Sequence, residues 1–182
     1  NGINEVTDEI SKDNSKKDII KYGYSQPVLT QIKEATSNID TKLSTETLVN
    51  NTTNDVILTA TLVTKDAKDS LFKNPYVSIE MPQEVTKVQL GTTEIMYDNQ
   101  AFNLVNSSVN VNDAGIKVIN IQLNGCQTAY GNGTVLDGAT IRIPMTVTLT
   151  KSMESKVGII KTICSNEITN STGNKETEVT LL

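Results

Sequence analysis

The stretch from residue 139 to residue 150, A-T-I-R-I-P-M-T-V-T-L-T, constrains the fold of this chain more than any other segment. Apolar side chains stand at every second position, with threonine, arginine or proline between them; the apolar positions are Ile141, Ile143, Met145, Val147 and Leu149. A period of two residues is the repeat of a β-strand with one buried face. Pro144 lies inside the run. Because proline has no N–H to give to a sheet, we predict that it lies on an edge strand or at a β-bulge.

Other segments show the same alternation. Val77, Ile79 and Met81 alternate with polar residues between Pro75 and Pro82. We predict that Ile79 and Met81 are buried and that the two prolines mark where strand pairing begins and ends. Strands are also predicted at residues 28–35, 56–63, 85–90, 94–97, 105–111, 116–123, 157–164 and 178–182, with turns or charged connections at 50–55, 65–74 and 112–115.

The composition agrees with a chain built from strands and turns. There are 25 Thr and 19 Asn, no Trp, and only 4% aromatic residues. Threonine suits a pleated sheet and asparagine suits turns, and no long segment has the period of a helix. We therefore predict an all-β sandwich of about eight or nine strands. Residues 1–24 are polar and Lys-rich, so we predict a lead-in or linker there, with a short helix as an option, and a single sandwich domain at 25–182.

The charge of the chain and the length of its apolar runs argue against two classes of partner. The net charge is −5, and the cations are 15 Lys and a single Arg, Arg142. Nucleic-acid binding needs a basic surface with arginine for bidentate contacts, so we predict no nucleic-acid partner. No apolar run approaches the roughly 20 residues of a membrane span, so we predict no membrane partner. We expect the chain to be one segment of a longer protein with neighbouring domains.

The chain has no histidine, which excludes Ser-His-Asp and Cys-His catalysis and zinc sites with histidine ligands. Carboxylate chemistry is the remaining alternative, because Glu80 and Glu84 flank Pro82 and a glycosidase uses two carboxylates in a cleft. However, Glu80 falls on the polar side of its predicted strand, so a solvated strand face is the interpretation that we favour. We predict no catalytic residue, no cofactor and no metal site.

Two loops are candidate binding sites. Residues 110–115, N-V-N-D-A-G, faintly resemble a calcium loop but lack the downstream bidentate glutamate, so we predict an ordinary turn. Residues 124–138 contain four glycines, and we predict a mobile loop tip there, with ligand contact as the alternative. The sequence G-N-G within it is no phosphate loop, because no Lys-Ser or Lys-Thr follows.

Two cysteines, Cys126 and Cys164, are too few for a disulfide scaffold. They are either two free thiols or one disulfide, and both alternatives stay open because the geometry that a bridge needs cannot be read from the sequence.

Several segments together resemble a known class of domain. The run V-I-L-T-A-T-L-V is followed by K-N-P-Y-V-S-I-E-M-P-Q-E-V, and later by I-K-V-I-N-I-Q-L-N-G and G-A-T-I-R-I-P-M-T-V-T-L. Over roughly residues 50–165 the chain resembles the Ig-like, conserved-repeat β-sandwich domains of adhesin-type surface proteins of Gram-positive bacteria. The resemblance implies an Ig-like sandwich, an extracellular location on the cell surface or cell wall, and no enzymatic activity. Such domains sometimes carry a Lys–Asn isopeptide bond, for which Lys33 and Asn166 are candidates.

Two functional hypotheses follow. The first is a non-catalytic structural or adhesive module of a bacterial cell-surface protein, which acts as a stalk or presents loops such as 98–115 and 124–138 to a protein or to the host matrix. The alternative is a carbohydrate-binding β-sandwich module of a secreted protein. Sugar platforms usually present Trp or Tyr rings, and here Trp is absent and the five Tyr are scattered along the sequence.

Overall fold

The chain folds into β-strands joined by turns. The computed structural model describes residues 20–21, 37–64, 71–97, 100–150, 154–167 and 171–182, and it has no helix among them. No helix long and apolar enough to cross a membrane occurs in this part of the chain. The strands are β1 (Ile20–Lys21), β2 (Ser37–Leu43), β3 (Thr47–Leu48), β4 (Thr52–Thr64), β5 (Leu71–Lys73), β6 (Tyr76–Glu80), β7 (Val85–Leu90), β8 (Glu94–Tyr97), β9 (Gln100–Leu104), β10 (Asn106–Val111), β11 (Lys117–Gln122), β12 (Cys126–Thr128), β13 (Gly131–Asn132), β14 (Thr134–Leu136), β15 (Thr140–Leu149), β16 (Lys156–Asn166) and β17 (Ser171–Leu181).

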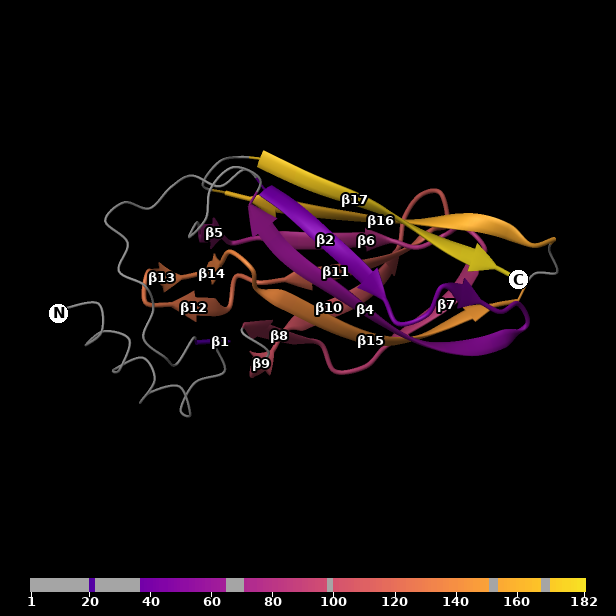
Figure 1. Cartoon of the computed structure of the whole chain (residues 1–182), viewed down its shortest axis with the longest axis horizontal. Helices are drawn as coiled ribbons and strands as arrows, with labels where there is room; N and C mark the ends of the chain where they lie inside the picture. Colours follow the sequence, from indigo (N-terminus) through magenta and orange to yellow (C-terminus); the bar gives the residue numbers. More distant parts are fainter. Residues whose placement is uncertain (1–19, 22–36, 65–70, 98–99, 151–153, 168–170) are drawn as a thin grey trace.

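Two six-stranded sheets form a sandwich, as the all-β pattern predicted (Figure 1). Sheet I has the strand order β10-β11-β6-β16-β17-β3. Sheet II has the order β2-β4-β15-β8-β9, and β7 also pairs with β15. Two small sheets, β1-β12-β13 and β14-β5, lie at one end of the molecule (Figure 1). The number of strands exceeds the eight or nine predicted, mainly because several are only two or three residues long.

The core lies between the two sheets and comes from the alternating runs. All five apolar residues of the 139–150 run are buried in β15, and the alternating apolar residues of β4 pack with them. Ile79 is 0% exposed and Met81 is 3% exposed, so the predicted burial of both is confirmed. Strand β6 begins directly after Pro75 and ends two residues before Pro82, also as predicted.

Pro144 lies neither on an edge strand nor at a bulge in the pairing of β15 with β4, so the predicted position is wrong. Strand β15 is central in sheet II, and Pro144 is opposite Ile57 of β4. On the other side of β15, β8 pairs with residues 140–142 and β7 pairs with residues 145–149, so Pro144 lies where one partner strand gives way to the next. Its carbonyl accepts the Gly91 N–H there at 2.8 Å. Because the nitrogen and carbonyl of one strand residue point to the same side, the missing N–H faces this break in the partner strands.

The glycine-rich segment 124–138 is not a mobile loop tip. It contains β12, β13 and β14, and Val135 and Leu136 are buried. The hydroxyls of Thr128 and Thr134 are hydrogen-bonded to each other at 2.6 Å in a buried position. Gly133 has a φ of 72°, and a Cβ on it would approach the side chain of Asn74 to 2.0 Å, so glycine is required for this close turn.

Some boundaries also differ from the predictions. The turn at 50–55 is shorter, because β4 already begins at Thr52. Residues 71–73 of the predicted charged connection form β5, which pairs with β14. Strands β2 and β3 had no predicted counterpart. The predicted strand 28–35, the division between residues 24 and 25, and Lys33 lie outside the described residues, so the domain division stays a prediction.

The sandwich is closed along one side by contact between β2 of sheet II and β17 of sheet I. The hydroxyls of Thr41 and Thr177 are hydrogen-bonded across this seam, and Lys175 Nζ lies 3.9 Å from Asp40 Oδ1. At Gly173 the strands come so close that a Cβ would lie 2.5 Å from the Ser37 carbonyl oxygen. This glycine therefore allows the approach of the two backbones.

Candidate functional site

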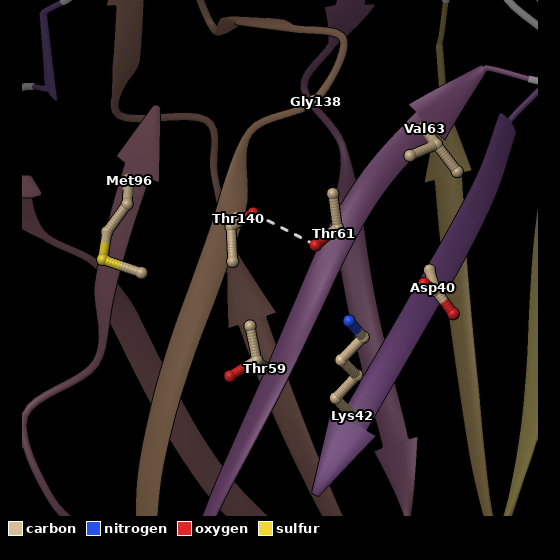
Figure 2. A pocket seen from close by; sticks show the side chains of 8 residues that line it. All are labelled: Asp40, Lys42, Thr59, Thr61, Val63, Met96, Gly138 and Thr140. Carbon is tan, nitrogen blue, oxygen red and sulfur yellow. Dashed lines mark hydrogen bonds between the residues drawn. The ribbon is translucent and has the colours of Figure 1, made fainter. Parts of the chain in front are cut away.

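A threonine-lined groove of about 460 Å³ lies on the outer face of sheet II (Figure 2). Side chains from β2, β4, β15 and β8 line it. The lining residues are Asp40, Lys42, Thr59, Thr61, Val63, Met96, Gly138 and Thr140. The groove is open to solvent and crosses four neighbouring strands.

Strand register brings these side chains together. Thr61 of β4 lies opposite Asp40 of β2 on one side and Thr140 of β15 on the other, and Thr140 lies opposite Met96 of β8. One row therefore crosses the floor of the groove. The hydroxyls of Thr61 and Thr140 are hydrogen-bonded at 3.0 Å (Figure 2). Thr59 stands opposite Lys42 in the next row.

The groove offers polar contacts but no reactive pair. Its charged groups are the Asp40 carboxylate, which Lys175 approaches only to 3.9 Å, and the Lys42 ammonium, which forms no ion pair with another described residue. Threonine hydroxyls lie between them. A nucleophile needs a neighbouring base within hydrogen-bond reach, and among the described residues the Thr61 hydroxyl is hydrogen-bonded only to the Thr140 hydroxyl. The arrangement can hold a polar ligand by hydrogen bonds, and it offers no acid–base pair for a reaction.

Glu80 and Glu84 line a second depression, of about 220 Å³, beside the start of β16. Glu84 Oε1 lies 3.1 Å from Lys156 Nζ, and Glu80 stands beside Lys161 on the outer face of sheet I. The carboxylates thus face lysines rather than an enclosed cleft. This placement agrees with the preferred interpretation of Glu80 as part of an outer strand face.

Residues 112–115 form the predicted turn between β10 and β11, and Asn110 and Val111 belong to β10. The Asn112 carboxamide oxygen accepts the N–H groups of Ala114 and Ile116, each at 3.0 Å. Gly115 closes the turn with a φ of 80°. Within the described ranges, no group of three or more His, Cys, Asp or Glu is placed to hold a metal ion.

Cys126 in β12 and Cys164 in β16 are free, buried thiols in the structure. Burial raises the pKa of each thiol to about 12 from the ordinary value of 9.0. A thiol with such a pKa is hardly ionised near neutral pH, so neither cysteine is placed as a nucleophile. Thiol labelling distinguishes this state from the disulfide that the sequence left open.

Asn166, the candidate for an isopeptide bond, uses its carboxamide to hold β5. It is 2% exposed. Its Oδ1 accepts the Lys73 N–H at 2.9 Å, and its Nδ2 donates to the Leu71 carbonyl at 3.3 Å. This role could not be predicted, because nothing in the sequence shows that residue 166 faces the backbone of residues 71–73.

No family model and no curated protein matches the sequence. Among solved structures, the chain is similar to a major pilin subunit of Bacillus cereus, with 14% identity and a TM-score of 0.46 over 80% of this chain and 39% of that one. It is similar to the N-terminal domain of a Streptococcus gordonii adhesin, with 10% identity and a TM-score of 0.49 over 79% and 32%. It is also similar to a protein that catalyses macrocyclization in alchivemycin A biosynthesis, with 9% identity and a TM-score of 0.45 over 86% and 96%.

The chain thus spans less than half of the Bacillus cereus pilin chain and of the Streptococcus gordonii adhesin chain. Identities of 9 to 14% and TM-scores below 0.5 are too low for any of these likenesses to support a functional assignment.

Proposed function

We propose that this chain is a non-catalytic structural module of a bacterial cell-surface protein, one that holds neighbouring domains apart as part of an extracellular stalk. The observation that carries the proposal is the arrangement of β2 and β17, the first and last long strands of the described sandwich. Both run in the same direction in Figure 1, lie against each other, and belong to different sheets.

This arrangement resists a pull along the long axis. A force on the start of β2 and on the end of β17 would draw the two strands in opposite directions. Strand β2 is held by seven residue pairs with β4, and β17 is held by eleven with β16. Because ladder hydrogen bonds lie perpendicular to the strands, sliding either strand loads all its bonds together instead of one after another.

A parallel pairing with β3 adds a further restraint at the end of β17. The Thr180 N–H donates to the Glu46 carbonyl at 2.8 Å, and the Leu182 N–H donates to the Leu48 carbonyl at 2.9 Å. The Leu182 carbonyl in turn accepts the Asn50 N–H at 2.5 Å. The C-terminal end of the sandwich is thereby tied to the connection between β2 and β4.

The sequence supports the same role. The chain has no histidine, so the commonest general base is missing, and its patterns resemble the surface domains of Gram-positive bacteria. The groove on sheet II offers hydroxyls without a reactive pair. An extracellular location, attachment to the cell wall and neighbouring domains in a longer chain belong to this proposal.

Single-molecule force spectroscopy tests the proposal by comparing two directions of pull. In the first, handles are fused to both ends of the chain. In the second, one handle is at the C-terminus and the other at Asp113, in the β10–β11 turn, so that the edge hairpin of sheet I is peeled away. We expect a clearly higher unfolding force in the first direction, because forced unfolding follows the barrier to strand sliding. Equal forces would contradict a stalk role.

A further inference from the structure

The outer face of sheet I carries two rows of uncharged side chains across five strands. Cross-strand register places their members side by side. The first row is Asn106, Gln122, Tyr76, Ser165 and Thr172, and the second is Ser108, Asn120, Ser78, Ile163 and Asn174. We call these ten residues the amide face. In the three central strands β11, β6 and β16, neighbours such as Ile121, Val77 and Cys164 are fully buried in the core, so the side chains between them point outward, and register continues both rows onto β10 and β17.

The absence of charge sets this face apart from the residues that border it. Each of the ten side chains is exposed or half-buried, and none is that of an Asp, Glu, Lys or Arg. The row directly beside them contains Glu80, Lys161 and Glu176. A charged partner therefore finds no opposite charge within the amide face itself, only in the row beside it.

The centre of the amide face is apolar. Tyr76 is 40% exposed and Ile163 is 38% exposed. They lie diagonally across β6 and β16, because Tyr76 stands opposite Ser165, two residues along from Ile163. Diagonal neighbours of this kind are within reach of an aromatic side chain.

Hydrogen bonds fix the tyrosine ring in place. The Tyr76 hydroxyl donates to the Asn120 carboxamide oxygen, and the Asn120 amide donates to the side-chain oxygen of Asn110. A ring that is already held needs no ordering when a ligand arrives, which favours binding.

The chemistry of this surface narrows the class of partner. A nucleic acid or an anionic polymer would need lysine or arginine, and the face has neither. A protein interface centres on several buried aromatic or arginine anchors, whereas here two apolar side chains are surrounded by amides and hydroxyls. A sugar ring fits the surface, because its C–H face can lie on Tyr76 and its hydroxyls can bond with Asn, Gln, Ser and Thr.

We propose that the amide face of sheet I binds a neutral glycan chain. Five neighbouring strands span about 19 Å, which suits an oligosaccharide better than a single sugar. The proposal goes beyond the stalk role and does not depend on it. A module that binds sugar but unfolds at low force would support glycan binding alone, and one that resists force but binds no sugar would support the stalk role alone. The tyrosines are scattered along the sequence, and one of them, Tyr76, lies on this face among amide side chains.

Isothermal titration calorimetry with three neutral tetrasaccharides, cellotetraose, mannotetraose and chitotetraose, tests the proposal. We expect at least one of them to bind the folded chain and heparin to bind no better. Tyr76→Ala should weaken that binding about tenfold or more, through the loss of ring stacking. Circular dichroism checks that each variant is folded.

A pair of matched variants ties the binding to this face. Gln122→Glu places a charge on an exposed strand position of the amide face with almost no change in shape. Gln89→Glu does the same at an exposed position of β7 in sheet II. We expect only Gln122→Glu to weaken binding. No binding of any of the three at millimolar concentration, a preference for heparin, or equal effects of the two variants would overturn the proposal.

Discussion

Replacing Asn166 by alanine should destabilise the fold more than its size suggests. Asn166 is 2% exposed, and its carboxamide satisfies the Lys73 N–H and the Leu71 carbonyl of β5. Each hydrogen bond contributes about 1 kcal/mol net, and a buried backbone group left without a partner costs roughly 1–3 kcal/mol. Because some water can enter the space left by the side chain, we expect Asn166→Ala to lower the free energy of unfolding by about 2–4 kcal/mol.

Urea denaturation gives the measurement, followed by far-ultraviolet circular dichroism or by tyrosine fluorescence, since the chain has no tryptophan. The matched control is Asn174→Ala, an exposed asparagine on the neighbouring strand β17. It should change the free energy of unfolding by no more than about 0.5 kcal/mol.

Asn166→Asp separates the two hydrogen bonds. The aspartate can still accept the Lys73 N–H, but an ionised carboxylate cannot donate to the Leu71 carbonyl. We expect this variant to be destabilised as well, although its size and shape are nearly unchanged. If Asn166→Ala and the control are equally stable, the role given to Asn166 is wrong.

Three further predictions concern stability and the two cysteines. Gly173→Ala should lower the free energy of unfolding by about 1–3 kcal/mol, and the melting temperature with it, because the alanine Cβ would lie 2.5 Å from the Ser37 carbonyl oxygen. The control is Gly125→Ala, where no atom lies within 4 Å of the added Cβ. Equal effects of the two variants would contradict the close approach of β17 to β2. Ellman's reagent should find no reactive thiol in the native protein and two after denaturation without reductant, whereas none after denaturation would mean that Cys126 and Cys164 form a disulfide. The same thiols should also make the free energy of unfolding fall with rising pH, because burial raises their pKa from 9.0 to about 12 in the folded chain. Their contribution to stability is complete below pH 9.0 and is lost between pH 9.0 and about 12. A loss of the same size in a double Cys→Ala variant would refute this.

The strands with strict alternation were predictable, and the reason is local. In β15 and β6 each second side chain is buried, so the sequence of these segments alone reveals strand and orientation. The same logic predicted the outward position of Glu80 and the burial of Ile79. It failed for β2, S-N-I-D-T-K-L, because only two of its seven residues, Ile39 and Leu43, are large and apolar.

Features that depend on contact between distant segments were not predictable. The glycines of the 124–138 segment make it look like a loop in the sequence. Its buried threonine pair and its pairing with residues 71–73 are visible only in the folded chain. Pro144 is tolerated in a central strand only because β7 and β8 meet beside it.

Both candidate binding surfaces are products of register in the same way. The groove on sheet II joins residues 40, 61, 140 and 96, and the amide face joins residues from five strands. A single sequence shows which side chains are polar, but it does not show which of them stand side by side.

The unfolding force of two isoleucine variants tests the stalk role most directly. Ile39 anchors β2 beside the seam with β17, and Ile119 lies in β11, away from the seam; both are buried. Replacement by alanine should cost each variant about 2–5 kcal/mol in equilibrium stability. When the chain is pulled by its two ends, we predict that Ile39→Ala lowers the unfolding force clearly more than Ile119→Ala does. Equal reductions in force at equal losses of stability would contradict the claim that the seam between β2 and β17 resists the pull.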